Sequence, residues 1–287
     1  MGRSGLASLL LVVLLPGCGG GDTDPAKQRG GATDSGPQHV HGLGINPRDG
    51  ALVIATHTGL FRAMPGERRA RRVGDLYQDT MGFTVVGPDR FLGSGHPDAR
   101  AELPPLLGLI RSEDGGRTWD PVSLLGKADF HVLRAAGPHV YGFDSTQARL
   151  LVSGDAGRTW DERTPPEPLV DLAIDPRRAN HVVASGEGGL FTSSDAGRRW
   201  RPLSRDRAGL LAWAGALYVV DLHGQVHRSG GAGRDWAEVG DWAEVGAIGG
   251  QPAAFVSHGR ELYVALHDGT IKRSTDGGRS WHVRVAA

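Results

Sequence analysis

Five octapeptides of similar sequence recur along the chain at nearly regular intervals. They are Ser112–Trp119, Ser153–Trp160, Ser193–Trp200, Ser229–Trp236 and Ser274–Trp281. Their third positions, four aspartates and one glycine, are residues 114, 155, 195, 231 and 276, so the intervals are 41, 40, 36 and 45 residues. Such recurrence is typical of repeated supersecondary units, and about 40 residues is the length of one four-stranded β-propeller blade. The sequence therefore predicts an all-β propeller.

Each octapeptide has the composition of a tight hairpin turn. Serine and aspartate side chains accept hydrogen bonds from backbone N–H groups a few residues on, and glycine adopts positive φ without steric cost. The closing tryptophan can fill the seam between two blades with its apolar face. We therefore expect structural roles for Ser112, Asp114, Gly116, Trp119, Ser153, Asp155, Gly157, Trp160, Ser193, Asp195, Gly197, Trp200, Ser229, Gly233, Trp236, Ser274, Asp276, Gly278 and Trp281.

Six units of alternating strand and turn patterns start near His39, Asp79, Asp129, Pro168, Ala208 and Gly250. The first unit has no octapeptide, but its turns at 46–50 and 58–61 match those of the fourth unit. Six four-stranded blades can close a ring, which removes exposed sheet edges. A seventh blade assembled from the two chain ends is the alternative.

A hexapeptide is duplicated in the fifth unit, as residues 235–240 and again as residues 241–246. Removing one copy from the 45-residue interval leaves 39 residues, which is a regular blade. The sequence predicts that one copy pairs in the blade and that the other bulges outward.

The N-terminal segment indicates export. Arg3 precedes an apolar stretch from Leu6 to Leu15, which is the length of a signal-peptide core, and Leu-Pro-Gly-Cys ends at Cys18, the one cysteine of the chain. We expect a lipoprotein signal peptide at 1–17, lipidation of Cys18, a polar tether at 18–38 and one propeller domain at 39–287. The protein is then extracytoplasmic and lipid-anchored to a bacterial cell membrane. The alternative is an ordinary secretory signal.

The charge balance argues against a nucleic-acid partner. Lys and Arg number 32 and Asp and Glu number 32, so the formal net charge is zero. The local cluster Arg68, Arg69, Arg71 and Arg72 is interpreted either as a solvated hairpin strand or as a contact for acidic lipid or glycan. We expect a monomer.

Histidines gather where the innermost strand of a predicted blade begins and where the second strand ends, positions that share one face of the ring. They are His39, His41, His57, His96 and His131. His39 and His41 are two residues apart on a predicted strand, so both imidazoles point to one side. If that side lines the central channel, the histidines could bind Zn²⁺ or Cu²⁺ with Asp79 or Asp129. Alternatively, they are solvated channel side chains.

The octapeptide pattern S-x-D-x-G-x-T-W resembles the Asp-box, or BNR repeat, of sialidases, sortilin-like receptors and the photosystem II assembly-factor propeller. In those families the repeat lies on the outer hairpin of a blade, away from the ligand face. The stretches 39–43, 56–60, 78–83, 94–98 and 129–131 resemble a family of bacterial envelope lipoproteins with BNR repeats. Its members are commonly described as glycosyl hydrolases or sialidase-like proteins. The resemblance implies a secreted propeller of six to seven blades and hydrolase chemistry.

That chemistry requires carboxylates, and the candidates on the same face are Asp79, Asp98, Asp144, Glu187 and Asp221. Sialidase activity is disfavoured. Arg62 lies in a segment that departs from the sialidase arginine motif, and three of the four tyrosines occupy positions that normally pack.

We therefore predict a binding role at the His-rich face, for a metal, a glycan or an envelope protein. The alternatives are a glycoside hydrolase and an assembly scaffold for a membrane complex.

Overall fold

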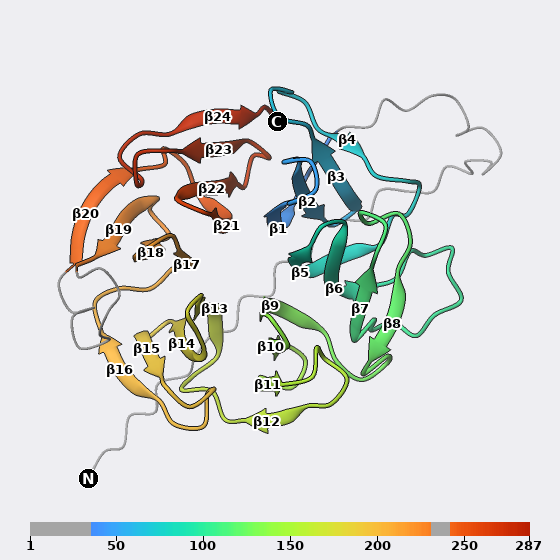
Figure 1. The fold of residues 1–287 in the computed structure, drawn as a ribbon, viewed down its shortest axis with the longest axis horizontal. Coiled ribbons are helices and arrows are strands. Elements are labelled where there is room, and N and C mark those ends of the chain that lie inside the picture. The colour runs from blue at the N-terminus through green and yellow to red at the C-terminus, as the bar shows by residue number, and fades with distance from the viewer. Residues whose placement is uncertain (1–35, 231–241) are drawn as a thin grey trace, which may run out of the picture. The chain divides into compact units, whose positions relative to one another are not determined.

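A computed structural model describes residues 36–230 and 242–287, which belong to one compact unit, Ser35–Ala287. Every regular element in the described residues is a β-strand, and the strands form six four-stranded antiparallel sheets, each built from four consecutive strands. This confirms the predicted all-β propeller. The described residues give six blades, and the two ends do not combine into a seventh (Figure 1).

The first three blades cover residues 40–163. Blade 1 consists of β1 (Val40–Ile45), β2 (Leu52–Thr56), β3 (Gly59–Ala63) and β4 (Arg71–Arg72). Blade 2 consists of β5 (Asp79–Gly87), β6 (Arg90–His96), β7 (Leu109–Ser112) and β8 (Asp120–Ser123). Blade 3 consists of β9 (Phe130–Ala136), β10 (His139–Asp144), β11 (Arg149–Ser153) and β12 (Asp161–Arg163).

The last three blades cover residues 169–285. Blade 4 consists of β13 (Leu169–Asp175), β14 (Arg178–Gly186), β15 (Gly189–Ser193) and β16 (Arg201–Ser204). Blade 5 consists of β17 (Leu210–Trp213), β18 (Leu217–Val220), β19 (Gln225–Ser229) and β20 (Trp242–Ala247). Blade 6 consists of β21 (Pro252–His258), β22 (Glu261–Leu266), β23 (Ile271–Ser274) and β24 (His282–Val285).

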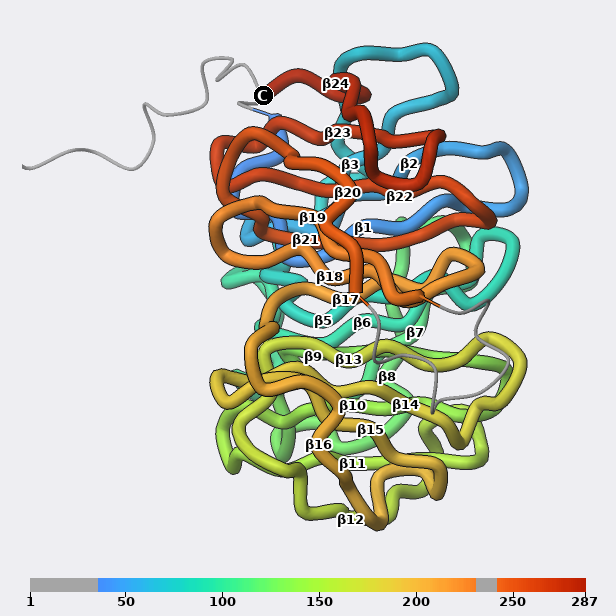
Figure 2. Tube along the Cα trace, turned by 90° about the vertical axis from the view of Figure 1, so that its left-hand side faces the viewer, coloured from blue at the N-terminus to red at the C-terminus, as the bar shows by residue number. Residues whose placement is uncertain are grey.

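The first strand of each blade lies at the centre of the ring, where it contacts the first strands of both neighbouring blades. The ring closes between β21 and β1, and Figure 2 shows the last blade beside the first. No strand is exchanged at this seam. Instead, the N–H of Ala286 donates to the carbonyl of Arg68 at 3.0 Å, and the Arg284 guanidinium donates to the Met64 carbonyl at 2.8 Å.

The octapeptides of blades 2, 3, 4 and 6 join the third strand to the fourth. In blade 3, Ser153 Oγ donates to Asp155 Oδ1 at 2.8 Å and accepts the N–H of Gly157 at 2.9 Å. The Asp155 carboxylate accepts the backbone N–H and the hydroxyl of Thr159 at 2.9 and 2.7 Å. These bonds lower the pKa of Asp155 to about 2. The carboxylate therefore serves as an acceptor that ties the turn.

Each of these turns packs against the preceding blade. Gly157 has φ of +84°, and a Cβ there would lie 2.1 Å from Leu109 Cδ2 of blade 2, so only glycine fits. Trp160 packs on the cluster of Leu109, Phe130 and Leu151 between blades 2 and 3, and its Nε1 donates to Ser123 Oγ at 2.9 Å. The tryptophan thus fills the seam between blades.

The fifth blade uses the second copy of the duplicated hexapeptide. Trp242 pairs with Ser229 and Ala243 with Arg228, and Trp242 packs on the cluster between blades 4 and 5 that contains Leu211. The predicted pairing of one copy is therefore confirmed. Gly233, Trp236 and the first copy lie outside the described residues, as do Cys18, the predicted signal peptide and tether residues 18–35.

The arginine cluster divides between solvent and structure. Arg71 and Arg72 form β4, the outermost strand of blade 1. Arg72 stacks its guanidinium 4.1 Å from the Tyr77 ring centroid and 4.5 Å from that of Phe61. Arg71 is 82% exposed.

Among residues 36–230 and 242–287, no helix is long and apolar enough to span a bilayer.

Candidate functional site

The inner strands of blades 1, 2, 3, 4 and 6 begin with an irregularity in their pairing to the second strand, which in blade 2 skips Met81. In blades 1, 3, 4 and 6 the register skips one residue, which is His41, His131, Val170 and Ala253 respectively. A β-bulge re-aims a side chain and is common beside functional sites. All four side chains line the same small cavity on the ring axis. The bulges therefore bring imidazoles from blades 1 and 3 to the central channel.

We call this end of the ring the His face; it carries His39, His41, His57, Asp79, His96, Asp129 and His131. Blade 1 supplies His41 from the start of β1 and His57 from the β2–β3 turn, and blade 2 supplies Asp79 from the start of β5. His57 Nδ1 lies 2.8 Å from Asp79 Oδ2, and His41 Nε2 lies 3.4 Å from Asp79 Oδ1. One ligand atom from each residue falls within 4.8 Å of the others. We call this group the metal triad.

Two atoms of the metal triad have unmet hydrogen-bonding capacity. Within the described part of the chain, His41 Nε2 and Asp79 Oδ1 are buried and have no hydrogen-bond partner, because their mutual approach lacks hydrogen-bond geometry. Buried polar atoms are nearly always satisfied in native proteins, so these two atoms require a partner, and a metal cation is one that both could bind. The His57 side chain is 62% exposed, which leaves the group open to solvent.

A second group surrounds Asp129, just before β9. Asp129 Oδ2 lies 2.9 Å from His131 Nε2 and 3.5 Å from His96 Nε2, while His96 Nδ1 lies 2.9 Å from the Pro105 carbonyl. The hydrogen bond to Asp129 raises the pKa of His131 against the effect of its burial, and the charge of Asp79 adds to the shift. Asp129 is 4% exposed, and its Oδ1 is a further buried atom without a partner among the described residues.

The predicted histidines thus fall into two neighbouring groups and not onto one point. The metal triad contains His41 and His57, and the Asp129 group contains His96 and His131. The two groups are linked through blade 2, because Asp79 and His96 are cross-strand partners. The remaining histidine, His39, lies beside the metal triad with its ring centroid 6.1 Å from that of His57.

Most of the predicted carboxylates hold loops. Asp98 accepts the N–H of Tyr77 at 2.8 Å and the Arg100 guanidinium, which holds its pKa well below the usual range. Asp144 is fully buried and accepts from Arg149 Nε at 3.1 Å. Asp221 accepts the N–H groups of residues 223 and 225, and Glu187 lies in the exposed β14–β15 turn. Of the five, Asp79 alone belongs to the metal triad.

The residues on which sialidase chemistry would depend are also engaged in structure. Arg62 pairs with Asp49 at 2.6 Å on the third strand of blade 1. Burial raises the pKa of Tyr141 to about 12, and its hydroxyl donates to the Ala179 carbonyl at 2.7 Å. Burial, together with a hydrogen bond to Glu261, likewise raises the pKa of Tyr263 to about 12.

Sequence reasoning missed an ion pair inside the channel. Arg134 Nη2 in β9 lies 2.6 Å from Asp171 Oδ1 in β13, and Asp171 is 2% exposed. The second carboxylate oxygen of Asp171 accepts the N–H of Leu211 at 2.8 Å, which links blades 4 and 5. An aspartate in the middle of the apolar strand Leu169–Asp175 was the available signal, because a carboxylate there must have a partner.

Comparison with known proteins agrees with the fold. The GH74 enzyme of Niastella koreensis superimposes with a TM-score of 0.59 at 14% identity over 87% of this chain and 45% of that one. The structure of YCF48 bound to D1 peptide gives a TM-score of 0.53 at 14% identity over 87% of this chain and 83% of that one. At these identities the likeness shows a β-propeller and nothing finer.

In sequence, the dispase autolysis-inducing protein of Streptomyces mobaraensis is 30% identical over 98 residues. The match spans 34% of this chain and 26% of that protein. No family model matches the chain.

Proposed function

We propose that this protein is an extracytoplasmic β-propeller that binds a divalent transition metal, Zn²⁺ or Cu²⁺, at the metal triad. The observation that carries the proposal is the convergence of His41, His57 and Asp79 within 4.8 Å, with two buried polar atoms of the group unsatisfied. Imidazole nitrogen and carboxylate oxygen are ligands that suit both metals.

The distances support this chemistry. Tetrahedral zinc holds nitrogen and oxygen ligands at about 2.0–2.2 Å, so two atoms bound to one ion lie about 3.3–3.6 Å apart. The 3.4 Å between His41 Nε2 and Asp79 Oδ1 is in that range, and the exposed His57, now 2.8 Å from Asp79 Oδ2, would move away by about half an ångström. His57 faces solvent, so a fourth position would remain open for water or an exchanging ligand. An open position is typical of metal sites that bind an exchangeable ligand and not of closed structural sites.

The location is the second part of the proposal. The segment at 1–17 reads as a lipoprotein signal, and a lipid on Cys18 with a polar tether would hold the propeller at the outer side of a bacterial membrane. Cys18→Ser should move the protein from the membrane fraction to the soluble exported fraction. Unchanged membrane association of that variant would contradict the lipid anchor and leave the metal proposal intact.

Titration calorimetry of the purified chain tests the metal site. We expect one Zn²⁺ per chain, and at least about tenfold weaker binding in His41→Ala and in His57→Ala. Loss of a residue that only orients a metal ligand weakens metal binding about tenfold or more, and loss of the ligand itself should weaken it at least as much. His282→Ala is the matched control, since His282 is an exposed residue on the outermost strand of blade 6. Absence of millimolar or tighter binding, or wild-type affinity in His57→Ala, would refute the metal site.

A further inference from the structure

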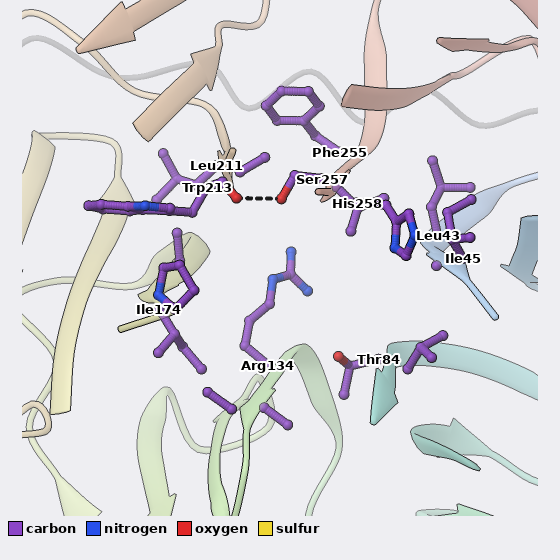
Figure 3. A pocket seen from close by; sticks show the side chains of 18 of the residues that line it. Leu43, Ile45, Thr84, Arg134, Ile174, Leu211, Trp213, Phe255, Ser257 and His258 are labelled. Carbon is purple, nitrogen blue, oxygen red and sulfur yellow. Dashed lines mark hydrogen bonds between the residues drawn. The ribbon is translucent and has the colours of Figure 1, made fainter. Parts of the chain in front are cut away.

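The end of the ring opposite the His face has a cavity of its own. It lies where the inner strands end, has a volume of about 320 Å³, and receives residues such as Ile45, Ile174, Trp213 and His258 from four blades (Figure 3). This volume is at the lower end of the range of small-molecule sites in proteins. We call it the axial pocket.

Most of the side chains that line the axial pocket are apolar, although polar atoms make up almost half of its exposed wall. Ile174 and Trp213 are partly exposed in the lining, whereas Leu211 and Phe255 contribute to it from nearly buried positions between blades. The lining contains no aspartate, glutamate or lysine among the described residues. The apolar part of the wall would bury the hydrocarbon or aromatic part of a ligand favourably, and the absence of carboxylates from the lining removes a source of repulsion for an anion.

One cationic group, Arg134, enters this apolar space. Figure 3 shows the Arg134 side chain reaching from β9 into the middle of the lining residues. Its Nη2 donates to Asp171 and its Nη1 to the Leu133 carbonyl at 3.0 Å. A guanidinium has five N–H donors, and the hydrogen bonds found within the described residues use only some of them. The Arg134 side chain is 30% exposed, so donors remain for a ligand.

The support behind Arg134 is rigid. Asp171 is almost fully buried, and its carboxylate also accepts the N–H groups of Leu172 at 2.7 Å and Leu211 at 2.8 Å. Burial raises the pKa of Asp171 against the opposing charge of Arg134. The guanidinium is therefore held in one orientation before any ligand arrives, and a preformed donor loses little entropy on binding.

We propose that the axial pocket binds a small organic acid, a monocarboxylate with an apolar body. The guanidinium of Arg134 pairs with the ligand carboxylate, because planar donors match carboxylate geometry, and the apolar walls cover the remainder of the ligand. A monoanion fits better than a dianion, since the single guanidinium already serves Asp171. The axial pocket lies at the other end of the channel from the metal triad, and Arg134 stands between the two, because it also lines the small cavity that receives His41 and His131.

Matched pairs of ligands test the charge requirement. Phenylacetate is compared with phenylacetamide and hexanoate with hexanamide by calorimetry on the full chain with a chelator present, which keeps metal out of the measurement. We expect each acid to bind at least about tenfold more tightly than its amide, because a hydrogen bond to a charged group is worth about 1.5–3 kcal/mol. Equal affinities of acid and amide, or no binding of either acid at about 10 mM, would overturn the proposal.

Two variants locate the binding. The double substitution Arg134→Met with Asp171→Asn removes both charges and avoids an unpaired buried ion, and it should abolish the preference for acids.

Thr84→Phe places a ring in the axial pocket and leaves Arg134 intact, so it should weaken acid binding at least about tenfold. This variant decides the question if the double variant does not fold. The matched control is Arg111→Met with Glu113→Gln, an exposed pair at 3.2 Å on blade 2. Wild-type acid binding in Thr84→Phe, or a retained preference in a folded double variant, would contradict the assignment.

Discussion

The octapeptide turns and the His face both depend on aspartates, but they use the carboxylate oxygens differently. In the turn of blade 3, both oxygens of Asp155 accept hydrogen bonds from the next residues along the chain. On the His face, Asp79 and Asp129 each keep one buried oxygen without a partner among the described residues. Saturated carboxylates therefore hold the fold, and unsaturated ones are available to a ligand.

The largest effect is expected at the glycine of an octapeptide. Gly157→Ala should lower the free energy of unfolding by about 3 kcal/mol, because the new Cβ meets Leu109 and the positive φ is strained. Urea denaturation measures the change. Gly154→Ala in the same hairpin is the control, since a Cβ there meets nothing within 4 Å, and it should change stability by less than about 0.5 kcal/mol. Equal losses in the two variants would show that the close packing of the turn is unimportant.

Zinc should produce the next largest change, and only through the His face. At a free concentration 100 times the dissociation constant, a single site stabilises the folded state by about 2.7 kcal/mol. Thermal unfolding with and without Zn²⁺ measures this effect. His57→Ala should remove about half of the shift or more, because tenfold weaker binding leaves about 1.4 kcal/mol at the same zinc concentration, whereas Asp155→Asn should lower the baseline stability and keep the shift. A zinc response in His57→Ala equal to that of the wild type would place the metal elsewhere.

Removing one side chain from each region sharpens the comparison. Ser153→Ala should cost about 2 kcal/mol of stability, because the buried N–H of Gly157 loses its acceptor. Asp79→Asn should change metal-free stability by less than about 0.5 kcal/mol, because Oδ1 has no hydrogen bond to lose and the contact of Oδ2 is to the exposed His57, from which an asparagine oxygen can still accept. Both are measured by urea denaturation with a chelator present. A larger loss from Asp79→Asn than from Ser153→Ala would reverse the assigned roles.

The smallest effects concern pH, and they have opposite signs in the two regions. The pKa of Asp155 is depressed to about 2, so its contribution to stability is full above its ordinary value of 3.8 and is lost as the pH falls towards 2. The pKa of His131 is raised, so its contribution is full below its ordinary value of 6.5 and is lost as the pH rises through the folded-state value. Proton NMR titration should find the pKa of His131 above 6.5 and lower in Asp129→Asn. An unchanged value in that variant would remove Asp129 as the cause.

The sequence was sufficient for the features that depend on short segments. The octapeptides predicted the turns, the blade length and the seam packing of Trp160, because each is fixed within one hairpin and its neighbour. Blade 1 was found without an octapeptide, from turns shared with blade 4. The two copies of the hexapeptide could not be told apart, since identical residues have identical local preferences, and the structure places Trp242 in the seam.

Features that depend on several blades were only partly predictable. The sequence predicted that the histidines share one face of the ring, but their division into two groups depends on bulges and on the distance between neighbouring inner strands. The Arg134–Asp171 pair was missed because the two residues are 37 positions apart on strands of different blades. The sequence pattern within either strand does not indicate which residue is the partner.

The seam between the last and first blades has one consequence for engineering. Since each blade is built from four consecutive strands and no strand crosses this junction, all six junctions are equivalent in topology. The Pro37 carbonyl lies so near Gly269 that a Cβ on that glycine would be 2.8 Å away, so the start of the described chain meets the blade that ends it. Circular permutants that join the ends by a short linker and reopen the chain between any other two blades should therefore assemble the same ring.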